Sequence, residues 1–287
     1  MTDEGFLSEA RVAFHKALLK NVLRTDRNGV PSNADRHSKL SVDLSLGILS
    51  RLGKSSKGNR IAGQMAGAKF EQVCAEFIAT VFPALNHLRP GSWEVSRGTG
   101  VGRRSIADFD QYDHLAALDA ALKANADLAV ALGIDYLIKP DVVIVREPED
   151  DERINGQQEL VGLNVARLTS LRKVNNPRAI LHASISCKWT IRSDRAQNAR
   201  SEALNLMRNR KGRLPHVVVV TGEPTPNRIA SIAMGTGDID CVYHFALKEL
   251  QEAVEESHYE DSAELLATMV NGKRLRDIAD LPLDLVI

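Results

Sequence analysis

An aspartate and a lysine with the chemistry needed at a phosphate group stand at the ends of two strand-like runs. Asp141 follows Pro140 and opens a β-branched run, while Ser186-Cys187-Lys188 closes an alternating run. Because side chains alternate along a strand, Ser186 and Lys188 would share one face, and Cys187 would offer its backbone carbonyl. Carboxylate and carbonyl oxygens are ligands that suit Mg²⁺, and a nearby lysine can orient a water or stabilise charge at phosphorus.

Two glutamates occupy unusual positions on expected helices. Glu202 stands about 40° from Leu206 on a helical wheel, at the edge of an apolar row. Glu71 falls within about 20° of Ile78, alongside a stripe that should be buried. Since a carboxylate in such a place needs a partner, both are candidate metal ligands beside the aspartate. Two metals held this way could clamp the attacking and leaving oxygens of a displacement at phosphorus, although each residue alone is more often structural.

The elements that must position these residues are those of an α/β protein. Helical periodicity is found at 6–23, 40–52, 64–81, 114–132 and from 247, and strand-like runs at 141–145, 179–189, 214–220 and 239–245. The segment 89–104 is expected to be a loop, and Asp194 with Gln197 predicts the N-cap of a helix after Lys188. This order predicts a central sheet flanked by helices, behind a helical N-terminal part. We expect one domain over 1–287, mainly helical at 1–85, with the catalytic sheet core at 135–250.

Composition limits the class of protein. The chain has 287 residues, of which 44% are hydrophobic and 26% charged, which allows a sizeable core and argues against disorder. No apolar run approaches the roughly 20 residues that a spanning helix needs, and the acidic start Thr2-Asp3-Glu4 is unlike a signal peptide. Three widely spaced cysteines exclude a disulfide framework and a zinc knuckle. We therefore expect a cytoplasmic protein with no membrane segment.

The net charge of zero conceals an uneven distribution. Residues 186–213 carry eight basic and two acidic side chains, whereas 249–287 carry three basic and ten acidic ones. Such asymmetry is typical of a face that binds a polyanion, although an ordinary fluctuation of surface charge explains it about equally well. The sequence also lacks the H-E-x-x-H pair of the simplest zinc hydrolases, the G-x-S-x-G elbow of α/β-hydrolases and the G-x-G-x-x-G fingerprint of dinucleotide-binding enzymes.

Pro140-Asp141 on one strand and Lys188 on the next resemble the Pro-Asp…(Asp/Glu)-x-Lys motif of a nuclease superfamily. Ser186 stands where the motif has its second acid, and Glu202 follows fourteen positions after Lys188, which matches the relocated carboxylate of one subgroup. The 46 residues between Asp141 and Lys188 match that subgroup as well. The sequence thus resembles the type II restriction endonucleases that recognise sites containing CCGG, most closely a tetrameric GCCGGC-cutting member.

Arg192-Ser193-Asp194-Arg195, shortly after Lys188, resembles the segment with which that family reads bases. At the N-terminus of a helix in the major groove, the two arginines can bond guanine O6 and N7, and the aspartate can accept from cytosine N4. This inventory suits a CCGG half-site, although a capped basic helix start is the simpler interpretation of the segment alone. By the same resemblance, Arg228 would read the outer guanine, Asp35 its paired cytosine, and Gln64 would contact the minor groove.

The resemblance implies a type II site-specific endodeoxyribonuclease with a mixed β-sheet of the restriction-endonuclease-like type. Its metal cage for Mg²⁺ would consist of Asp141, Glu71, Glu202 and the Cys187 carbonyl. Lys188 would position the attacking water, with support from Ser186. The resemblance also implies hydrolysis of double-stranded DNA before CCGG, with four-base 5′ overhangs, by homodimers that pair into a homotetramer.

Three other interpretations remain open. A structure-selective repair nuclease would keep Asp141 and Lys188 but needs no base-reading segment, so mutation of Arg192 and Arg195 would lower only its general affinity. A sequence-specific DNA-binding protein on an inactive nuclease scaffold would bind its site without cutting in Mg²⁺. A cytosolic α/β enzyme acting on a small molecule would be expected to carry a cofactor fingerprint, which the sequence lacks.

Overall fold

The structure, a computed structural model, describes residues 5–53, 63–98, 104–125, 127, 130, 140–235 and 237–287, and the side chains of residues 119 and 193–196 are not among those described. The α-helices are α1 (Phe6–Asn21), α2 (Lys39–Leu52), α3 (Gly63–Val81), α4 (Leu115–Ala124), α6 (Asp151–Asn155), α7 (Ser193–Asn209), α8 (Pro226–Ala233), α9 (Leu247–Glu256), α10 (Glu260–Asn271) and α11 (Leu281–Asp284). Short 3₁₀ helices are η1 (Phe82–Leu85), η2 (Ile106–Asp108) and η3 (Asp110–Tyr112). The strands are β1 (Ser92–Arg97), β2 (Val142–Glu147), β3 (Ile180–Lys188), β4 (His216–Thr221), β5 (Cys241–His244) and β6 (Leu275–Asp277).

Within the described residues, six strands form one mixed sheet in the order β1-β2-β3-β4-β5-β6. Strands β1 to β3 pair antiparallel, and β3 to β6 pair parallel. Val142, at the start of β2, pairs with Ile185 near the end of β3, and Lys188 pairs with Thr221 at the end of β4. The amino end of β2 and the carboxyl ends of β3 and β4 therefore meet at one end of the sheet.

Residue type explains how the central strands are buried. The valines of β4, residues 217–220, are all buried, as expected for an interior parallel strand that is covered on both faces. At the end of β3, Ser186 and Lys188 are half-buried while Cys187 between them is buried. The predicted alternation, which places Ser186 and Lys188 on one face, is confirmed.

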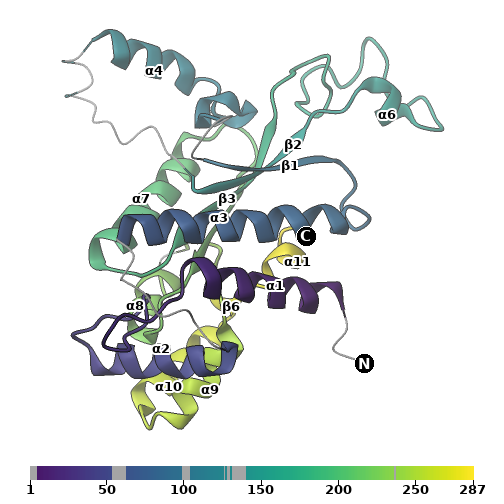
Figure 1. Cartoon of the computed structure of the whole chain (residues 1–287). Coiled ribbons are helices and arrows are strands. Elements are labelled where there is room, and N and C mark those ends of the chain that lie inside the picture. Colours follow the sequence, from purple (N-terminus) through teal and green to yellow (C-terminus); the bar gives the residue numbers. More distant parts are fainter. Residues whose placement is uncertain are drawn as a thin grey trace.

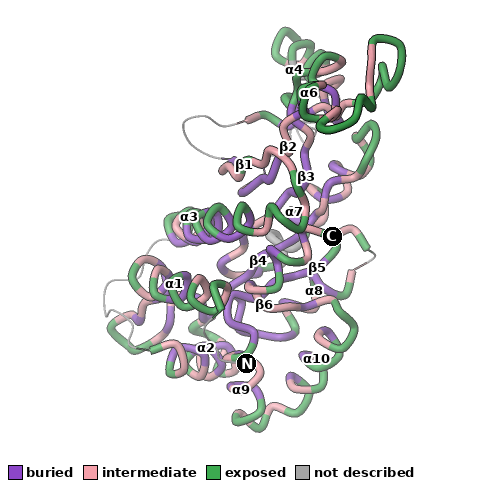
Figure 2. Tube along the Cα trace, turned by 90° about the vertical axis from the view of Figure 1, so that its right-hand side faces the viewer, coloured by how far each residue is buried: buried purple, intermediate pink, exposed green. Residues whose placement is uncertain are grey.

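Helices cover the sheet and attach the N-terminal part to it. Helix α3 lies across the sheet and contacts β1 and β3 (Figure 1). The ring centroid of Phe70 on α3 lies 5.0 Å from that of Trp189, which follows β3. Helix α1 packs on α3, and α2 packs on α9. Figure 2 shows buried residues along the strands and the inner helix faces, and mostly exposed residues around α4 and α6. Each large apolar side chain that is buried in the core contributes about 2 kcal/mol to the stability of the fold.

The predicted α/β fold, with a sheet flanked by helices and a helical N-terminal part, is confirmed. Helices α1, α2 and α3 and strands β2 to β5 each begin and end within two residues of the predicted ranges. The helix expected over 114–132 is present as α4, and most of the range beyond residue 125 lies outside the described residues. In the part of the chain that the structure describes, no helix is long and apolar enough to cross a membrane.

Two local predictions were wrong. The segment 89–104 is not a continuous loop, because β1 pairs with β2 and packs Trp93 and Val95 against the core. Its half-buried residues give no strong period-2 pattern, so tertiary pairing decides this strand. The N-cap of α7 is Arg192 rather than Asp194, which lies in the first turn of the helix. Strand β6, with three residues, was too short to predict.

Candidate active site

The carboxylate of Asp141 receives hydrogen bonds from three consecutive residues at the end of β3. Its Oδ2 lies 2.7 Å from the backbone N of Cys187, 3.3 Å from Nζ of Lys188 and 3.5 Å from Oγ of Ser186. All the hydrogen bonds that the described residues donate to this carboxylate end on Oδ2. The structure therefore brings the predicted Asp141, Ser186 and Lys188 together, and Cys187 joins them through its backbone N–H.

The surroundings of Lys188 keep its side chain positively charged. Burial, the largest influence, would by itself lower the pKa of Lys188, but the charges of Asp141 and Glu202 and the hydrogen bond to Asp141 outweigh it. The pKa is raised above its ordinary value. At neutral pH this lysine is a cation that can donate hydrogen bonds, not a base that can accept a proton.

Glu202 on α7 belongs to the same electrostatic cluster. Its pKa is raised, chiefly by burial and further by the negative charge of Asp141, while Lys188 and Ser186 act in the opposite direction. The carboxyl of Glu202 is thus held near another acid in a partly dehydrated place, where a bound cation would stabilise its charged form. The predicted inward orientation of this helix residue agrees with its side-chain hydrogen bond with Ser186 and its charge interaction with Lys188.

Glu71 lies on the buried face of α3 and is 8% exposed. Its Oε1 is 3.4 Å from Nη2 of Arg97, the last residue of β1. The expectation that a carboxylate on this stripe needs a partner is confirmed, and the partner is an arginine of the strand that was not predicted. The place of Glu71 among the metal ligands stays a prediction.

The donor chemistry of the Asp141 and Glu202 pair fits Mg²⁺. Among the residues that the structure describes, no three His, Cys, Asp or Glu side chains form a group that could hold a metal ion. Mg²⁺ needs fewer protein ligands, because it is usually bound by one or two carboxylates together with waters and substrate phosphates. Asp141 and Glu202 offer two carboxylates, and the charges of both act on Lys188.

Arg228 and Asp35, predicted to read one outer base pair, form an ion pair. Nη2 of Arg228 is 2.5 Å from Oδ2 of Asp35, and both side chains are about one-third exposed. The hydrogen bond from Arg228 holds the pKa of Asp35 below its ordinary value. Residues separated by 193 positions in the chain are thus adjacent in space. Gln64, in the first turn of α3, is exposed, and its minor-groove role stays a prediction.

The predicted inner base-reading segment lies at the start of α7, shortly after the end of β3 that carries Lys188. Arg192 is exposed and has extended backbone angles, φ −118° and ψ 163°, as the N-cap of the helix. The backbones of Asp194 and Arg195 lie in the first helical turn, while their side chains are outside the described residues. The segment therefore begins four residues after Lys188, at an exposed helix N-terminus.

Sequence reasoning missed Glu223, which is 0% exposed and connects the two segments that were predicted to read bases. Its Oε2 accepts the backbone N–H of Ile191 at 2.9 Å, and its Oε1 accepts the N–H of Thr225 at 3.2 Å and the hydroxyl of the same residue. Nη1 of Arg228 is 3.9 Å from Oε2. Burial raises the pKa of Glu223. The only feature of the sequence that could have indicated a buried role for Glu223 was its position just after the apolar strand β4. That position alone does not distinguish a buried acid from a surface one.

Sequence reasoning also missed the role of Gly98, which follows β1. Its N–H donates to the Asp141 carbonyl at 2.9 Å. A Cβ atom at this position would stand 1.6 Å from the Pro140 carbonyl oxygen. Only glycine allows the backbones of these two segments to lie so close. Gly98 thus helps to position Asp141, and no phosphate-binding fingerprint is needed to explain it.

The chain is similar to a known restriction enzyme over nearly its full length. Residues 14–287 match the family described as NgoMIV restriction enzyme. The chain is 53% identical over 283 residues to the type II restriction enzyme NgoMIV of Neisseria gonorrhoeae, with 98% of this chain and 99% of that protein covered. Among solved structures, a complex of the restriction endonuclease PspGI with substrate DNA covers 98% of this chain and 90% of that one, at 15% identity and a TM-score of 0.33. The chain belongs to the NgoMIV restriction enzyme family and is a type II restriction endonuclease.

Proposed function

We propose that this enzyme hydrolyses double-stranded DNA at GCCGGC, before CCGG, and leaves four-base 5′ overhangs with a 5′-phosphate and a 3′-hydroxyl. The observation that carries the proposal is the meeting of Asp141 and Lys188, 3.3 Å apart, in a chain of the NgoMIV restriction enzyme family. The carboxylate, the cation and the adjoining Glu202 are the groups that phosphodiester hydrolysis requires.

Mg²⁺ is the proposed cofactor. Its ligands would be Asp141, Glu202, Glu71 and the Cys187 carbonyl, directly or through water. When bound, the cation would stabilise the negative charge that develops at the phosphate. Since Glu71 contacts Arg97, we expect Asp141 and Glu202 to be the principal ligands.

Lys188 and Ser186 complete the catalytic groups of the proposed site. Because its raised pKa keeps Lys188 protonated, Nζ can donate to the attacking water and to an oxygen of the phosphate, which orients the water and stabilises charge. Ser186 donates to the same carboxylate oxygen as Lys188, so it keeps Asp141 aligned with the end of β3. Neither residue has to accept a proton in this arrangement.

The base-reading residues suit a palindrome with CCGG at its centre. Arg192 and Arg195 would bond guanines and Asp194 cytosines of the inner base pairs. The outer pair would be read by Arg228 and Asp35, because guanine O6 and N7 lie beside cytosine N4 in the major groove and the two side chains lie 2.5 Å apart. Gln64 is the proposed minor-groove contact.

A palindromic site requires a two-fold homodimer, in which each subunit reads one half-site. We propose that two dimers pair into a homotetramer. The segment between α6 and β3 supports a further contact between subunits, because it exposes large apolar side chains, among them Leu163 at 92% and Leu168 at 98%. The three cysteines are free and buried, which agrees with the proposed location in the reducing cytoplasm.

The test is a digest of a long, fully sequenced DNA by the purified full-length enzyme, with and without Mg²⁺, followed by sequencing of the fragment ends. We expect discrete fragments in Mg²⁺ whose ends carry 5′-CCGG overhangs flanked by G and C. Discrete fragments with other ends would contradict the proposed site. A smear would favour a nonspecific or structure-selective nuclease, and intact DNA in both reactions would contradict Mg²⁺-dependent cleavage.

A further inference from the structure

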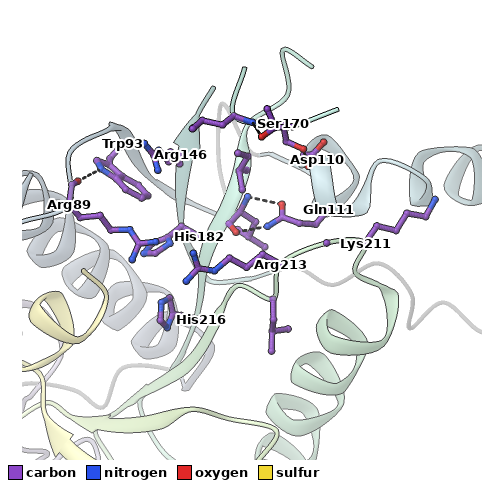
Figure 3. Close-up of a pocket in the computed structure, with 16 residues that line it drawn as sticks. Arg89, Trp93, Asp110, Gln111, Arg146, Ser170, His182, Lys211, Arg213 and His216 are labelled. Atoms are coloured by element: carbon purple, nitrogen blue, oxygen red, sulfur yellow. Dashed lines mark hydrogen bonds between the residues drawn. The ribbon is translucent and has the colours of Figure 1, made fainter. Parts of the chain in front are cut away.

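A cavity of about 410 Å³ opens at the end of the sheet opposite the catalytic residues. Its walls come from the starts of β3 and β4, from β1 and the residue Arg89 before it, from Arg146 on β2, from η3, and from residues 169–171 and 211–214. His182 near the start of β3 and His216 at the start of β4 lie at its floor (Figure 3). This volume falls in the range of small-molecule sites, roughly 300–1,000 Å³.

Positive charge converges in this cavity. The side chains of Arg89 and Arg213 extend toward one another from opposite walls and meet around His182, while Arg146 lies above Trp93 (Figure 3). Burial and then the charges of Arg213 and Arg146 lower the pKa of Arg89. Burial is also the main cause that lowers the pKa of His182 to about 4, and the charges of Arg89 and Arg213 act in the same direction.

The acceptors around Arg89, Arg146 and Arg213 do not fully neutralise the positive charge of these three side chains. The Arg89 side chain donates to the C-terminal Ile287 oxygen, and Arg146 lies 3.6 Å from Glu149. Arg213 is exposed, and its guanidinium makes no hydrogen bond or ion pair with the residues that the structure describes. Nη2 of Arg146 donates to the Pro90 carbonyl at 3.3 Å, while its buried Nε has no hydrogen-bond partner there.

The one carboxylate in the cavity lining, Asp110, is already engaged. It accepts hydrogen bonds from the hydroxyl of Ser170 and the amide of Asn176. Asp240 and Asp284 lie near enough to raise the pKa of His216, yet burial and the charges of Arg89 and Arg213 keep that pKa below its ordinary value. The arginines in the cavity therefore remain in excess over the acids that face them.

We propose that this cavity binds a small phosphate monoester, with Arg89 and Arg213 as its anchors. A guanidinium presents paired N–H donors that match the oxygens of a phosphate, and two of them on opposite walls can hold one dianion. The neutral imidazole of His216 offers one further donor or acceptor at the floor. An anion here would relieve the mutual repulsion of Arg89, Arg146 and Arg213.

The site is separate from the one that acts on DNA. His182 and Lys188 are six residues apart on β3, which at about 3.3 Å per residue places them roughly 20 Å from each other. Because β3 and β4 are parallel, the cavity lies at their amino ends and the catalytic residues at the carboxyl end of β3. The basic stretch 186–213 therefore divides between the two ends of the sheet.

The experiment is isothermal titration of the full-length enzyme, free of DNA and divalent metal, with inorganic phosphate and separately with adenosine 5′-monophosphate. We expect saturable binding and a loss of about tenfold to a hundredfold in affinity in Arg213→Gln and Arg89→Gln, the range for a hydrogen bond to a charged group. Lys16→Gln removes one charge from the exposed face of α1 and should leave the affinity unchanged. Arg213→Gln should still cut DNA.

The outcomes separate the possible sources of the signal. Tighter binding of the nucleotide identifies an organic monoester as the ligand, and equal affinities identify the phosphate group alone; both support the proposal. A loss in Arg192→Gln with none in Arg213→Gln would place the anion on the DNA-binding face and overturn it. No saturable binding by the wild-type enzyme would overturn it as well. Thermal unfolding midpoints of all variants establish that they are folded.

Discussion

The fully buried carboxylate of Glu223 accepts the backbone N–H of Ile191 at 2.9 Å. Ile191 directly precedes Arg192, and Thr225, which donates to the other oxygen of Glu223, is the N-cap of the helix that carries Arg228. One side chain thus connects the segments proposed to read the inner and the outer base pairs. It holds their relative position through backbone bonds, without needing to contact DNA.

Glu223→Gln should lower discrimination between GCCGGC and sites with one substituted base. The amide fits the same space, but only its oxygen can accept a hydrogen bond. If its N–H₂ faces Ile191, the N–H of Ile191 loses its acceptor, and if its N–H₂ faces Thr225, the bonds from Thr225 are lost. An unsatisfied buried donor costs about 1–3 kcal/mol. The measurement is the ratio of cleavage rates on cognate and substituted duplexes. Tyr243→Phe removes a hydroxyl bonded to Asp284 elsewhere in the sheet and should change stability alone. An unchanged ratio in Glu223→Gln would show that this bond does not position the base-reading segments.

Asp141→Asn should abolish cleavage and retain specific binding. The amide oxygen can still accept the N–H of Cys187, so the end of β3 keeps its shape, while the charge that attracts a cation is lost. We expect a fall of roughly three orders of magnitude in single-turnover cleavage, with DNA affinity in Ca²⁺ little changed. Asp150→Asn, at an exposed residue paired with Lys173, is the control. Cleavage at the wild-type rate would mean that Asp141 is not a metal ligand.

Asp35→Asn should relax the preference for the outer base pair. The amide can donate as well as accept, and it no longer holds Arg228 through an ionic contact. We expect discrimination against ACCGGT to fall by roughly tenfold to a hundredfold, because a good side-chain contact to a base is worth about 1–3 kcal/mol. Cleavage of matched duplexes measures it. Asp43→Asn, which changes the acceptor of the Tyr259 hydroxyl, should leave the preference intact.

Gly98→Ala should slow cleavage more than it weakens DNA binding. The added methyl would collide with the Pro140 carbonyl oxygen, so the segment that presents Asp141 must move. Even a shift of about 1 Å can cost about a hundredfold in rate. Gly67→Ala, on α3 with open space around its Cβ position, is the matched control and should stabilise the helix by about 1 kcal/mol. Rates that match in both variants would contradict the positioning role of Gly98.

Acid should destabilise the enzyme through two buried histidines. Burial lowers the pKa of His182 and of His244 to about 4, below the ordinary 6.5. Between these values the unfolded chain binds more protons than the folded one, so stability is lost as the pH falls from 6.5 toward 4, by up to about 3 kcal/mol per histidine. The raised pKa of Glu223 acts in the opposite direction.

Urea unfolding at about pH 7 and about pH 5 measures this dependence. His244→Gln keeps a neutral polar group in the same place and should flatten the pH profile between those values. A wild-type free energy of unfolding that rises on acidification in this range would contradict the assignment.

Local chemistry was sufficient to predict the strand ends that carry Asp141 and Lys188 and the helices beside them. Side-chain alternation placed Ser186 and Lys188 on one face, and helical spacing placed Glu71 among buried residues; the structure bears out both. These inferences succeeded because the period of a strand or a helix is a property of consecutive residues.

Contacts between distant segments were decided by the tertiary structure alone. β1 became a strand because β2 lies beside it, Glu71 obtained Arg97 as its partner, and Glu223 obtained Ile191, 32 positions earlier. The cavity with Arg89 and Arg213 likewise joins residues from distant segments of the chain. Such pairings depend on which strands are neighbours and in which register, and the periodicity of one segment carries no information about the position of another.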